Sequence, residues 1–313
     1  MDALTNVLTH IRSSGALLGR TLANPPWSAV FAEKSSLTLV AMIRGDAWIV
    51  EGGQSHRLRP HDIAVVVGPA PFEVTSDPGM SPDPMYVQTE AGVCLAADGG
   101  VADSIALGTR TCGTQLDADD TMLTGSFTVN GRVADRLLTT LPRVFVVPHE
   151  SQRTKTLGLL EAEIMREEPG QQVILDRLLD VVLAAALRDW FAMPEVQAPG
   201  WYRASSDPTV GAALSAIHDF PEHPWTTATL AEQSNVSRAT LARRFTELLG
   251  EPPLTYLTSW RLCLAADLLE QSDSTVESVA REVGYSSGYS LSTAFYREYG
   301  IRPSRYRRAS VDA

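Results

Sequence analysis

The sequence predicts an α+β protein: an N-terminal β-barrel of jelly-roll type with accessory helices, then an all-α C-terminal domain. Three observations support this prediction. Short β-rich runs separated by glycine and proline fill residues 36–148, helical periodicity covers residues 152–193, and a helical pattern after residue 227 occurs twice. Because 313 residues are enough for two separate cores, we divide the chain into residues 1–150, 151–193, 194–208 and 209–310.

The composition is that of an ordinary globular protein, with 44% hydrophobic and 20% charged residues. No apolar stretch approaches the roughly 20 residues of a membrane span, and the N-terminus lacks the pattern of a signal peptide. We therefore expect a cytoplasmic protein that does not contact a membrane. In that compartment Cys94, Cys112 and Cys263 are not expected to form structural disulfides.

The N-terminal half begins with an amphipathic helix over residues 2–11, which we expect to lie on the barrel. Nine β-rich runs follow. Their shortness and their glycine and proline punctuation favour a barrel or a double-sheet jelly roll, with strands at 37–43, 47–50, 56–58, 62–67, 72–75, 85–88, 109–116, 122–129 and 144–147.

Two further helices are predicted at residues 156–167 and 171–191, separated by Pro169-Gly170. The second helix carries a wide apolar stripe that must be buried. This stripe packs either against the barrel or against a second copy of the chain, and the sequence leaves both alternatives open. Residues 194–208 are rich in proline, glycine and serine and are typical of a linker.

The first helix-turn-helix pattern has a helix at 227–234, a turn at Asn235-Val236 and a second helix that begins after Ser237 and ends at Gly250. Serine is a good N-cap and glycine a good helix stop. Leu241, Phe245 and Leu248 recur every three or four residues and define one buried face. Basic and hydroxyl residues at the start of a second helix are typical of helices that enter the DNA major groove.

The pattern then recurs, with helices at 276–283 and 287–295 around a Gly284-Tyr285 turn. Phe245 and Phe295 are 295 − 245 = 50 positions apart, and a helix over 254–270 joins the two copies. A single pattern of this kind is also found in plain helical bundles. Two copies favour tandem helix-turn-helix units.

The net charge of −11 is adverse for a nucleic-acid partner, so its distribution matters. From residue 205 onward there are 10 arginines and 13 acidic residues, which leaves −3 there and −8 before it. The arginines are nevertheless grouped, in residues 238–244 and 302–308. A local basic face on an acidic domain fits sequence-specific DNA binding.

Residues 250–269, 279–286 and 295–307 together resemble the DNA-binding domain of the AraC/XylS transcriptional regulators. The resemblance implies that Ala239, Ala242 and Arg243 face base edges, with Arg243 bonding both acceptors of a guanine. It places Arg238, Thr240 and Arg244 near phosphates or neighbouring bases. The second unit offers shorter donors, which are Ser287, Tyr289, Ser290, Ser292 and Thr293. Near the C-terminus the candidate phosphate anchors are Arg302, Arg305, Arg307 and Arg308, and the alternative is that they belong to a fraying tail.

The runs Arg44-Gly45-Asp46-Ala47-Trp48, residues 58–62 and Pro71-Phe72 resemble the cupin-type sensor domain found in many of these regulators. Metal-dependent cupins bring two closely spaced histidines, a glutamate and a later histidine to one ion. Here His56 and His61 are five residues apart and Phe72 occupies the region of the later histidine. We therefore expect neither a metal nor another cofactor.

Two kinds of signal remain open for this domain. Trp48 and Phe72 are candidates to line a cavity for a small-molecule effector, although strand aromatics more often belong to the core. Cys112, in Thr111-Cys112-Gly113, is similar to a cysteine in a cupin-bearing subgroup that includes reactive-chlorine-responsive regulators. Oxidation could pair Cys112 with Cys94, and the alternative is that both are small apolar residues.

We thus predict a sequence-specific transcriptional regulator that binds double-stranded promoter DNA under the control of a small molecule or an oxidant. It is not expected to be an enzyme. RNA polymerase and a second copy of the chain are further candidate partners. The alternative is a cupin-type enzyme fused to a DNA-binding domain.

Overall fold

The computed structural model describes residues 3–8, 11–12, 18–32, 34–79, 83–88, 94–95, 106–108, 110–129, 131–166, 168–271 and 274–311. Contacts divide the chain into two compact units. The sheet unit comprises Ile11–Val129 and Leu141–Val196, and the helical unit comprises Met1–His10, Asn130–Thr140 and Gln197–Ala313.

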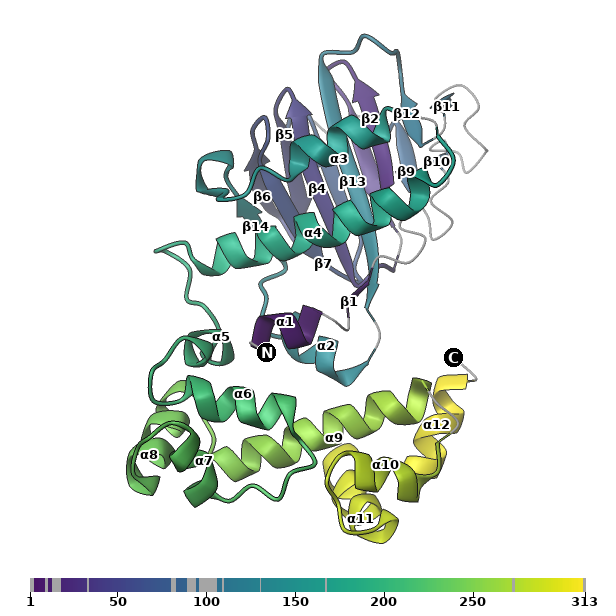
Figure 1. Cartoon of the computed structure of the whole chain (residues 1–313). Helices are drawn as coiled ribbons and strands as arrows, with labels where there is room; N and C mark the ends of the chain where they lie inside the picture. Colours follow the sequence, from purple (N-terminus) through teal and green to yellow (C-terminus); the bar gives the residue numbers. More distant parts are fainter. Residues whose placement is uncertain are drawn as a thin grey trace. The chain divides into compact units, whose positions relative to one another are not determined.

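The sheet unit contains two sheets (Figure 1). In the larger sheet the strand order is β11-β12-β2-β13-β4-β7-β14, with β1 also on β13, and in the smaller sheet it is β10-β9-β3-β8-β5-β6. The strands are β1 (Ile11–Arg12), β2 (Leu18–Ala23), β3 (Ser28–Phe31), β4 (Leu37–Arg44), β5 (Ala47–Glu51), β6 (Gln54–Leu58), β7 (Ile63–Val67), β8 (Phe72–Thr75), β9 (Tyr86–Gln88), β10 (Cys94–Leu95), β11 (Ala106–Gly108), β12 (Thr111–Gly113), β13 (Asp120–Val129) and β14 (Val144–Val147).

The alternation of side chains along β4 explains how the larger sheet is buried on both faces. Val40 and Met42 belong to the core cluster that lies between the sheets, whereas Leu39 and Ala41 are buried outside that cluster. Successive side chains of a strand point to opposite faces, so a run buried at every position needs cover on both sides. Phe31 stacks on Phe72 in the core, with ring centroids 4.8 Å apart.

The sequence prediction of short strands is confirmed, but the closed barrel is wrong. The described strands form two separate sheets, and no ladder of hydrogen bonds among them joins one sheet to the other. The chain crosses between sheets instead, since β4 and β7 lie in the larger sheet while β5, β6 and β8 lie in the smaller one. A sandwich of this kind hides its core without closing on itself.

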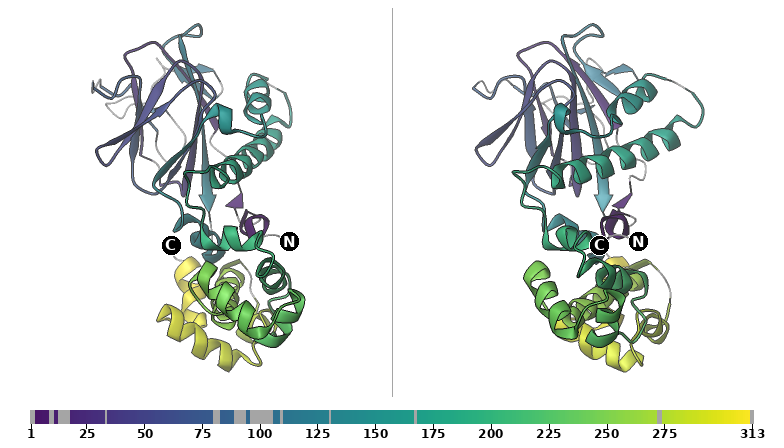
Figure 2. Two further views of the ribbon diagram at one scale, coloured as in Figure 1. Left: turned by 90° about the vertical axis from the view of Figure 1, so that its left-hand side faces the viewer. Right: turned by 60° about the vertical axis from the view of Figure 1, so that its left-hand side comes forward.

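Helices α3 (Leu157–Ile164) and α4 (Gln171–Phe191) cover the outer face of the larger sheet, as both views of Figure 2 show. A Cβ on Gly125 of β13 would lie 2.6 Å from a Leu179 methyl group, and Phe145 stacks on Trp190 at 4.6 Å. Most of the apolar stripe predicted on α4 is therefore buried within the unit. Val173, Ile174 and Val181 remain 64%, 48% and 49% exposed.

The helical unit contains the other described α-helices, and the sheet unit also has a 3₁₀ turn, His149–Ser151. Among the described residues no helix is both long and apolar enough to span a membrane. The N-terminal helix that was predicted to lie on the barrel, α1, packs instead on α2, α5 and α6. The unit comprises α1 (Ala3–Leu8), α2 (Arg132–Leu138), α5 (Gly200–Ser205), α6 (Gly211–Asp219), α7 (Thr227–Gln233), α8 (Arg238–Leu249), α9 (Pro253–Gln271), α10 (Val276–Glu282), α11 (Gly288–Tyr299) and α12 (Pro303–Val311).

Helix α2 is notable because it lies between β13 and β14 in sequence yet packs on α9. Asp267 of α9 caps it by accepting hydrogen bonds from the backbone N–H groups of Arg132, at 2.5 Å, and Val133, at 3.3 Å. The Arg132 guanidinium lies over the ring of Tyr299 at 5.3 Å and donates to the Tyr306 hydroxyl at 3.0 Å. These contacts make the segment between β13 and β14 part of the helical unit.

Candidate DNA interface

The helix pair α7–α8 is built by local capping and two buried side chains. Ser237 accepts a hydrogen bond from the Thr240 N–H at 3.1 Å, and Gly250 ends α8 with φ +79°. Both predicted helix boundaries are thus confirmed, because serine satisfies a free N–H and glycine tolerates the left-handed conformation. Leu241 and Phe245 are fully buried, so the opposite face of α8 is the one that is exposed to solvent.

The outward face of α8 carries the residues expected to read DNA. Arg238, Ala239 and Arg243 are exposed, while Thr240, Ala242 and Arg244 are half-buried. Arg243 is a long donor on this face, and 68% of its side chain is exposed. The hydroxyl of Thr240 lies 2.9 Å from that of Ser237 and takes part in the cap.

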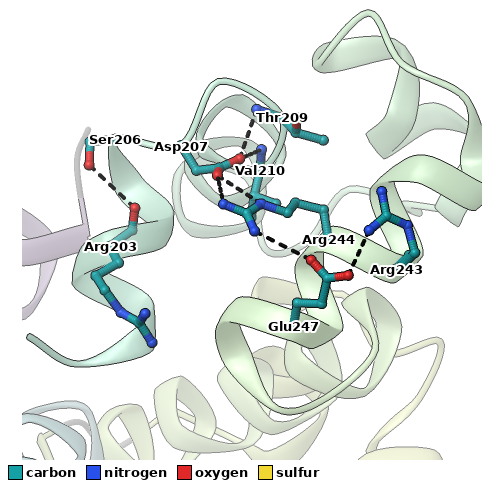
Figure 3. A network of polar contacts seen from close by, with 8 residues as sticks. All are labelled: Arg203, Ser206, Asp207, Thr209, Val210, Arg243, Arg244 and Glu247. Atoms are coloured by element: carbon teal, nitrogen blue, oxygen red, sulfur yellow. Dashed lines mark hydrogen bonds and ion pairs between the residues drawn. The ribbon is translucent and has the colours of Figure 1, made fainter. Parts of the chain in front are cut away.

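Arg243 and Arg244 are both held by carboxylates (Figure 3). Arg243 Nη1 donates to Glu247 Oε1 at 2.6 Å, and Arg244 Nη1 donates to Glu247 Oε2 at 3.3 Å. Arg244 also donates from Nε and Nη2 to Asp207 Oδ2, at 3.0 and 2.8 Å. Asp207 Oδ1 in turn accepts the N–H groups of Thr209, at 2.9 Å, and Val210, at 3.1 Å, just before α6.

These contacts keep both carboxyl groups charged. Hydrogen bonds from Arg243 and Arg244 lower the pKa of Glu247. Burial on its own would raise the pKa of Asp207, but hydrogen bonds from Arg244 and from two backbone N–H groups outweigh it and lower that pKa. Near neutral pH the network therefore contains two carboxylates and two guanidinium groups.

The pair α10–α11 repeats this construction. Ser287 caps α11 by accepting from the Ser290 N–H, Leu291 and Phe295 are fully buried, and Gly300 ends the helix with φ +68°. The two second helices, α8 and α11, correspond at an offset of 50 residues, since their N-caps are Ser237 and Ser287 and their C-terminal glycines are Gly250 and Gly300. The two first helices, α7 and α10, begin at Thr227 and Val276 and correspond at an offset of 276 − 227 = 49 residues. The turn before α11 therefore has one residue more than the turn before α8.

The hydroxyl groups expected to contact DNA from α11 are engaged within the helix. Ser287 and Ser290 form a reciprocal capping box. Ser292 donates to the Gly288 carbonyl at 2.7 Å, and Thr293 donates to the Tyr289 carbonyl at 3.0 Å. Tyr289 is the prominent exposed side chain of this helix, at 84%.

A groove of about 830 Å³ runs beside α11, with walls from α10 and the start of α12; it is lined by Val276, Glu277, Gly288, Tyr289, Ser292, Thr293, Tyr296, Arg302, Pro303 and Ser304. Arg302 lines the groove, and Arg305 is also exposed. Arg307 is engaged elsewhere, since its guanidinium donates to the carbonyls of Leu269, at 3.3 Å, and Ser274. The side chain of Arg308 lies outside the described residues.

Among the described side chains expected to sense a signal, Phe72 and Cys112 share one core cluster and Trp48 lies outside it. Trp48 is half-buried with the Arg57 guanidinium 5.5 Å from its ring centre, whereas Phe72 is buried on Phe31 in the core between the sheets. Cys112 is disulfide-bonded, so the expectation that it forms no disulfide is wrong, and it packs against that core. Cys94 lies on β10 opposite Gln88 of β9, and its side chain is outside the described residues. Cys263 is a free, buried thiol, as expected for a core residue.

Sequence reasoning missed Glu247 and Asp207. Glu247 follows Arg243 by four residues on one helix, a spacing that places side chains together and was available from the sequence. Asp207 is 244 − 207 = 37 residues from Arg244, and no local pattern joins them. The predicted contacts of Arg244 with DNA did not take this buried partner into account.

Family comparisons agree with a sheet domain followed by a DNA-reading helical domain. Residues 2–192 match the cupin family, and residues 230–309 match the helix-turn-helix domain family. A cupin domain followed by such a domain defines a class of DNA-binding regulators. The chain belongs to the AraC-like transcription regulators.

Two regulators are similar to this chain over almost its whole length. A putative AraC-like transcription regulator of Streptomyces lividans is 30% identical over 318 residues, covering 98% of each chain. The HTH-type transcriptional regulator AlkR of Acinetobacter baylyi is 29% identical over 320 residues, covering 99% of this chain and 100% of AlkR. The DNA-binding domain of AdpA, solved with a target DNA, is 38% identical over 33% of this chain and 93% of that domain, with a TM-score of 0.31.

Proposed function

We propose that this transcriptional regulator binds promoter DNA through two helix-turn-helix units, α7–α8 and α10–α11, and that α8 provides most of the base readout. The observation that carries the proposal is the exposed Arg243 on the outward face of a helix whose inward face is fixed by Leu241 and Phe245. A guanidinium can bond both acceptors of a guanine, a contact that contributes about 1 to 3 kcal/mol of discrimination.

Helix α11 has a different role in this proposal. At the offset of 50, Thr293 takes the place of Arg243, and its hydroxyl already donates within the helix. Tyr289, Arg302 and Arg305 supply exposed groups for sugar, phosphate and apolar contacts. Helix α9 sets the spacing, since recognition helices in successive major grooves must lie about 34 Å apart.

The test compares Arg243→Ala with Thr293→Ala in binding titrations against a duplex selected by the wild-type chain and a scrambled duplex. We expect Arg243→Ala to lower the ratio of the two affinities about tenfold or more, and Thr293→Ala to change it little. If Thr293→Ala removed discrimination while Arg243→Ala preserved it, the ranking of the two helices would be wrong. Arg244 is outside this test because Asp207 holds it.

We also propose that a signal received by the sheet unit controls DNA binding and reaches the helical unit through α2. Helix α2 lies in sequence between β13 and β14, two strands of the larger sheet, and it packs on α1 and on α9, the helix that joins the two helix pairs. A shift of either strand would therefore act on the helix that spaces the DNA-reading units. Asp267→Ala removes the cap that holds α2, and we expect it to weaken the response of DNA binding to the signal.

A small molecule and a thiol oxidant are two candidates for that signal. The disulfide of Cys112 beside the sandwich core favours the oxidant, since its reduction would alter packing at the edge of that core. Replacing Cys94 and Cys112 by serine and measuring DNA affinity with and without hypochlorite separates the candidates. An unchanged response to the oxidant would leave the small-molecule effector.

The remaining proposals concern partners and chemistry. Val173, Ile174 and Val181 on α4 and Leu159 on α3 give the sheet unit an exposed apolar surface, which suits a homodimer. Sedimentation equilibrium that showed only monomer at micromolar concentration would exclude it. We place the protein in the cytoplasm with promoter DNA, where RNA polymerase is a further candidate partner.

We propose that the chain is a regulator and not an enzyme fused to a DNA-binding domain. The part of the chain that the structure describes has no group of three or more His, Cys, Asp or Glu side chains arranged to hold a metal ion. His61 lies at a turn with φ +67°, and its ring centre is 5.2 Å from that of His149. Elemental analysis of the purified protein is expected to find no stoichiometric metal, and finding one would favour the enzyme.

A further inference from the structure

Glu247 holds the arginine that is proposed to read DNA. The carboxylate and Arg243 are one turn apart on α8, their side chains are 42% and 68% exposed, and their closest atoms are 2.6 Å apart. Any DNA that approaches this face meets a negative charge next to the donor that it must engage. Arg243 cannot give the same N–H to Glu247 and to a base.

The other end of the network is fixed. The side chain of Asp207 is 9% exposed and accepts two N–H groups of Arg244, and Arg244 in turn donates to the second oxygen of Glu247. Glu247 is thus bonded through both oxygens, one to Arg244, which Asp207 anchors, and one to the exposed Arg243 (Figure 3). The carboxylate therefore stays in place when Arg243 leaves it.

We propose that Glu247 is a specificity-determining residue that makes DNA compete for Arg243, and this inference rests on the proposed base readout by Arg243. A correctly placed guanine offers two acceptors to the guanidinium and replaces the lost ion pair. A phosphate at a wrong sequence offers a contact no better than the one lost, and Glu247 also repels it. Glu247 lowers affinity for all DNA but lowers it most for the wrong DNA.

The second helix pair lacks this device. At the offset of 50 the counterparts of Arg243, Arg244 and Glu247 are Thr293, Ala294 and Arg297. The position one turn after Thr293 on α11 is thus basic, and the carboxylate of Glu277 in that pair accepts the Gly288 N–H at 2.6 Å and belongs to α10. The acid therefore accompanies the reading arginine and is not a general property of the repeated fold.

The experiment measures affinities of the full chain for a duplex selected by the wild-type chain and for a scrambled duplex of the same composition. Glu247→Gln removes the competing charge while keeping the shape of the side chain. Glu232→Gln is the matched control, because Glu232 is an exposed acid on α7 of the same helix pair. Circular dichroism establishes that both variants are folded.

We expect Glu247→Gln to bind the scrambled duplex about twofold to fivefold more tightly than Glu232→Gln does, the range typical for one exposed charge pair. The gain for the selected duplex is expected to be smaller, so the affinity ratio falls. With Arg243→Ala in the background, Glu247→Gln should no longer change the ratio.

Equal effects of the two Gln variants, or a ratio that is unchanged or rises with Glu247→Gln, would overturn the inference. Failure of the base-readout proposal has a separate signature, since Arg243→Ala alone would then leave the ratio intact. A fall in affinity for both duplexes with Glu247→Gln would show that Glu247 supports Arg243 in the complex and does not compete with DNA.

Discussion

Asp267 offers a direct test of how α2 is attached to α9. Burial raises the pKa of this carboxyl group from 3.8 to about 6, although the backbone N–H groups of Arg132 and Val133 oppose the shift. The residue is only 3% exposed. The perturbation is Asp267→Asn, which keeps the shape and one carbonyl acceptor but does not titrate.

The sign of the effect follows from proton binding. Between pH 3.8 and about 6 the folded chain keeps the proton of Asp267 while the unfolded chain loses it, so stability falls as the pH rises. At about 1.4 kcal/mol per pKa unit, a pKa raised from 3.8 to about 6 corresponds to a loss of stability of at most about 3 kcal/mol. This loss is complete once the pH exceeds about 6. The free energy of unfolding of Asp267→Asn relative to wild type should therefore increase by up to that amount from pH 4 to pH 7.

The assay follows urea unfolding of the wild type and the variant at several pH values, so that all other titrating groups cancel in the difference. Carbon NMR of the Asp267 carboxyl group gives the pKa directly. A carboxyl group that titrates near pH 4, or a stability difference that does not vary with pH, would refute the account of α2 docking given above.

Two glycine predictions test local geometry, each by urea unfolding. Gly250→Ala should destabilise the helical unit by about 1 kcal/mol because φ is +79° at this position. A Cβ there meets no atom within 4 Å, so the whole effect is conformational. A variant as stable as the wild type would contradict this prediction. Gly125→Ala should cost about 1 to 3 kcal/mol because the new Cβ would overlap the Leu179 methyl groups at 2.6 and 2.7 Å. Gly158→Ala, on α3 with open space around it, is the control and should be neutral or stabilising.

Features set by neighbouring residues were predictable from the sequence. The boundaries of α8 follow from Ser237 and Gly250, and its buried face follows from the spacing of Leu241 and Phe245. Helix α4 has the predicted bounds of 171–191, because Pro169-Gly170 ends one helix before the next apolar stripe begins. Capping and helical periodicity act over only a few residues, so one sequence contains them.

Features set by distant residues were not predictable. The barrel was wrong because short β-rich runs do not reveal which strands pair or whether a sheet closes. The strands at Leu18–Ala23 and Ser28–Phe31 were missed, as was α2, which depends on Asp267 about 130 residues later. The ion pair of Arg244 with Asp207 is also non-local. Side chains from distant segments meet only once the fold exists.

The two helix pairs show which positions are constrained by folding and which are open to function. At the offset of 50, the cap Ser237, the buried Leu241 and Phe245, and the helix stop Gly250 recur as Ser287, Leu291, Phe295 and Gly300. These residues make the helix and bury it, so a change at any of them costs stability in either copy. The outward residues differ between the two copies. The positions of Arg243 and Glu247 in the first copy are occupied by Thr293 and Arg297 in the second. An outward side chain is not needed to bury the helix, so its identity is free to follow what it binds. The different outward residues are the reason for proposing different roles for α8 and α11 in DNA binding.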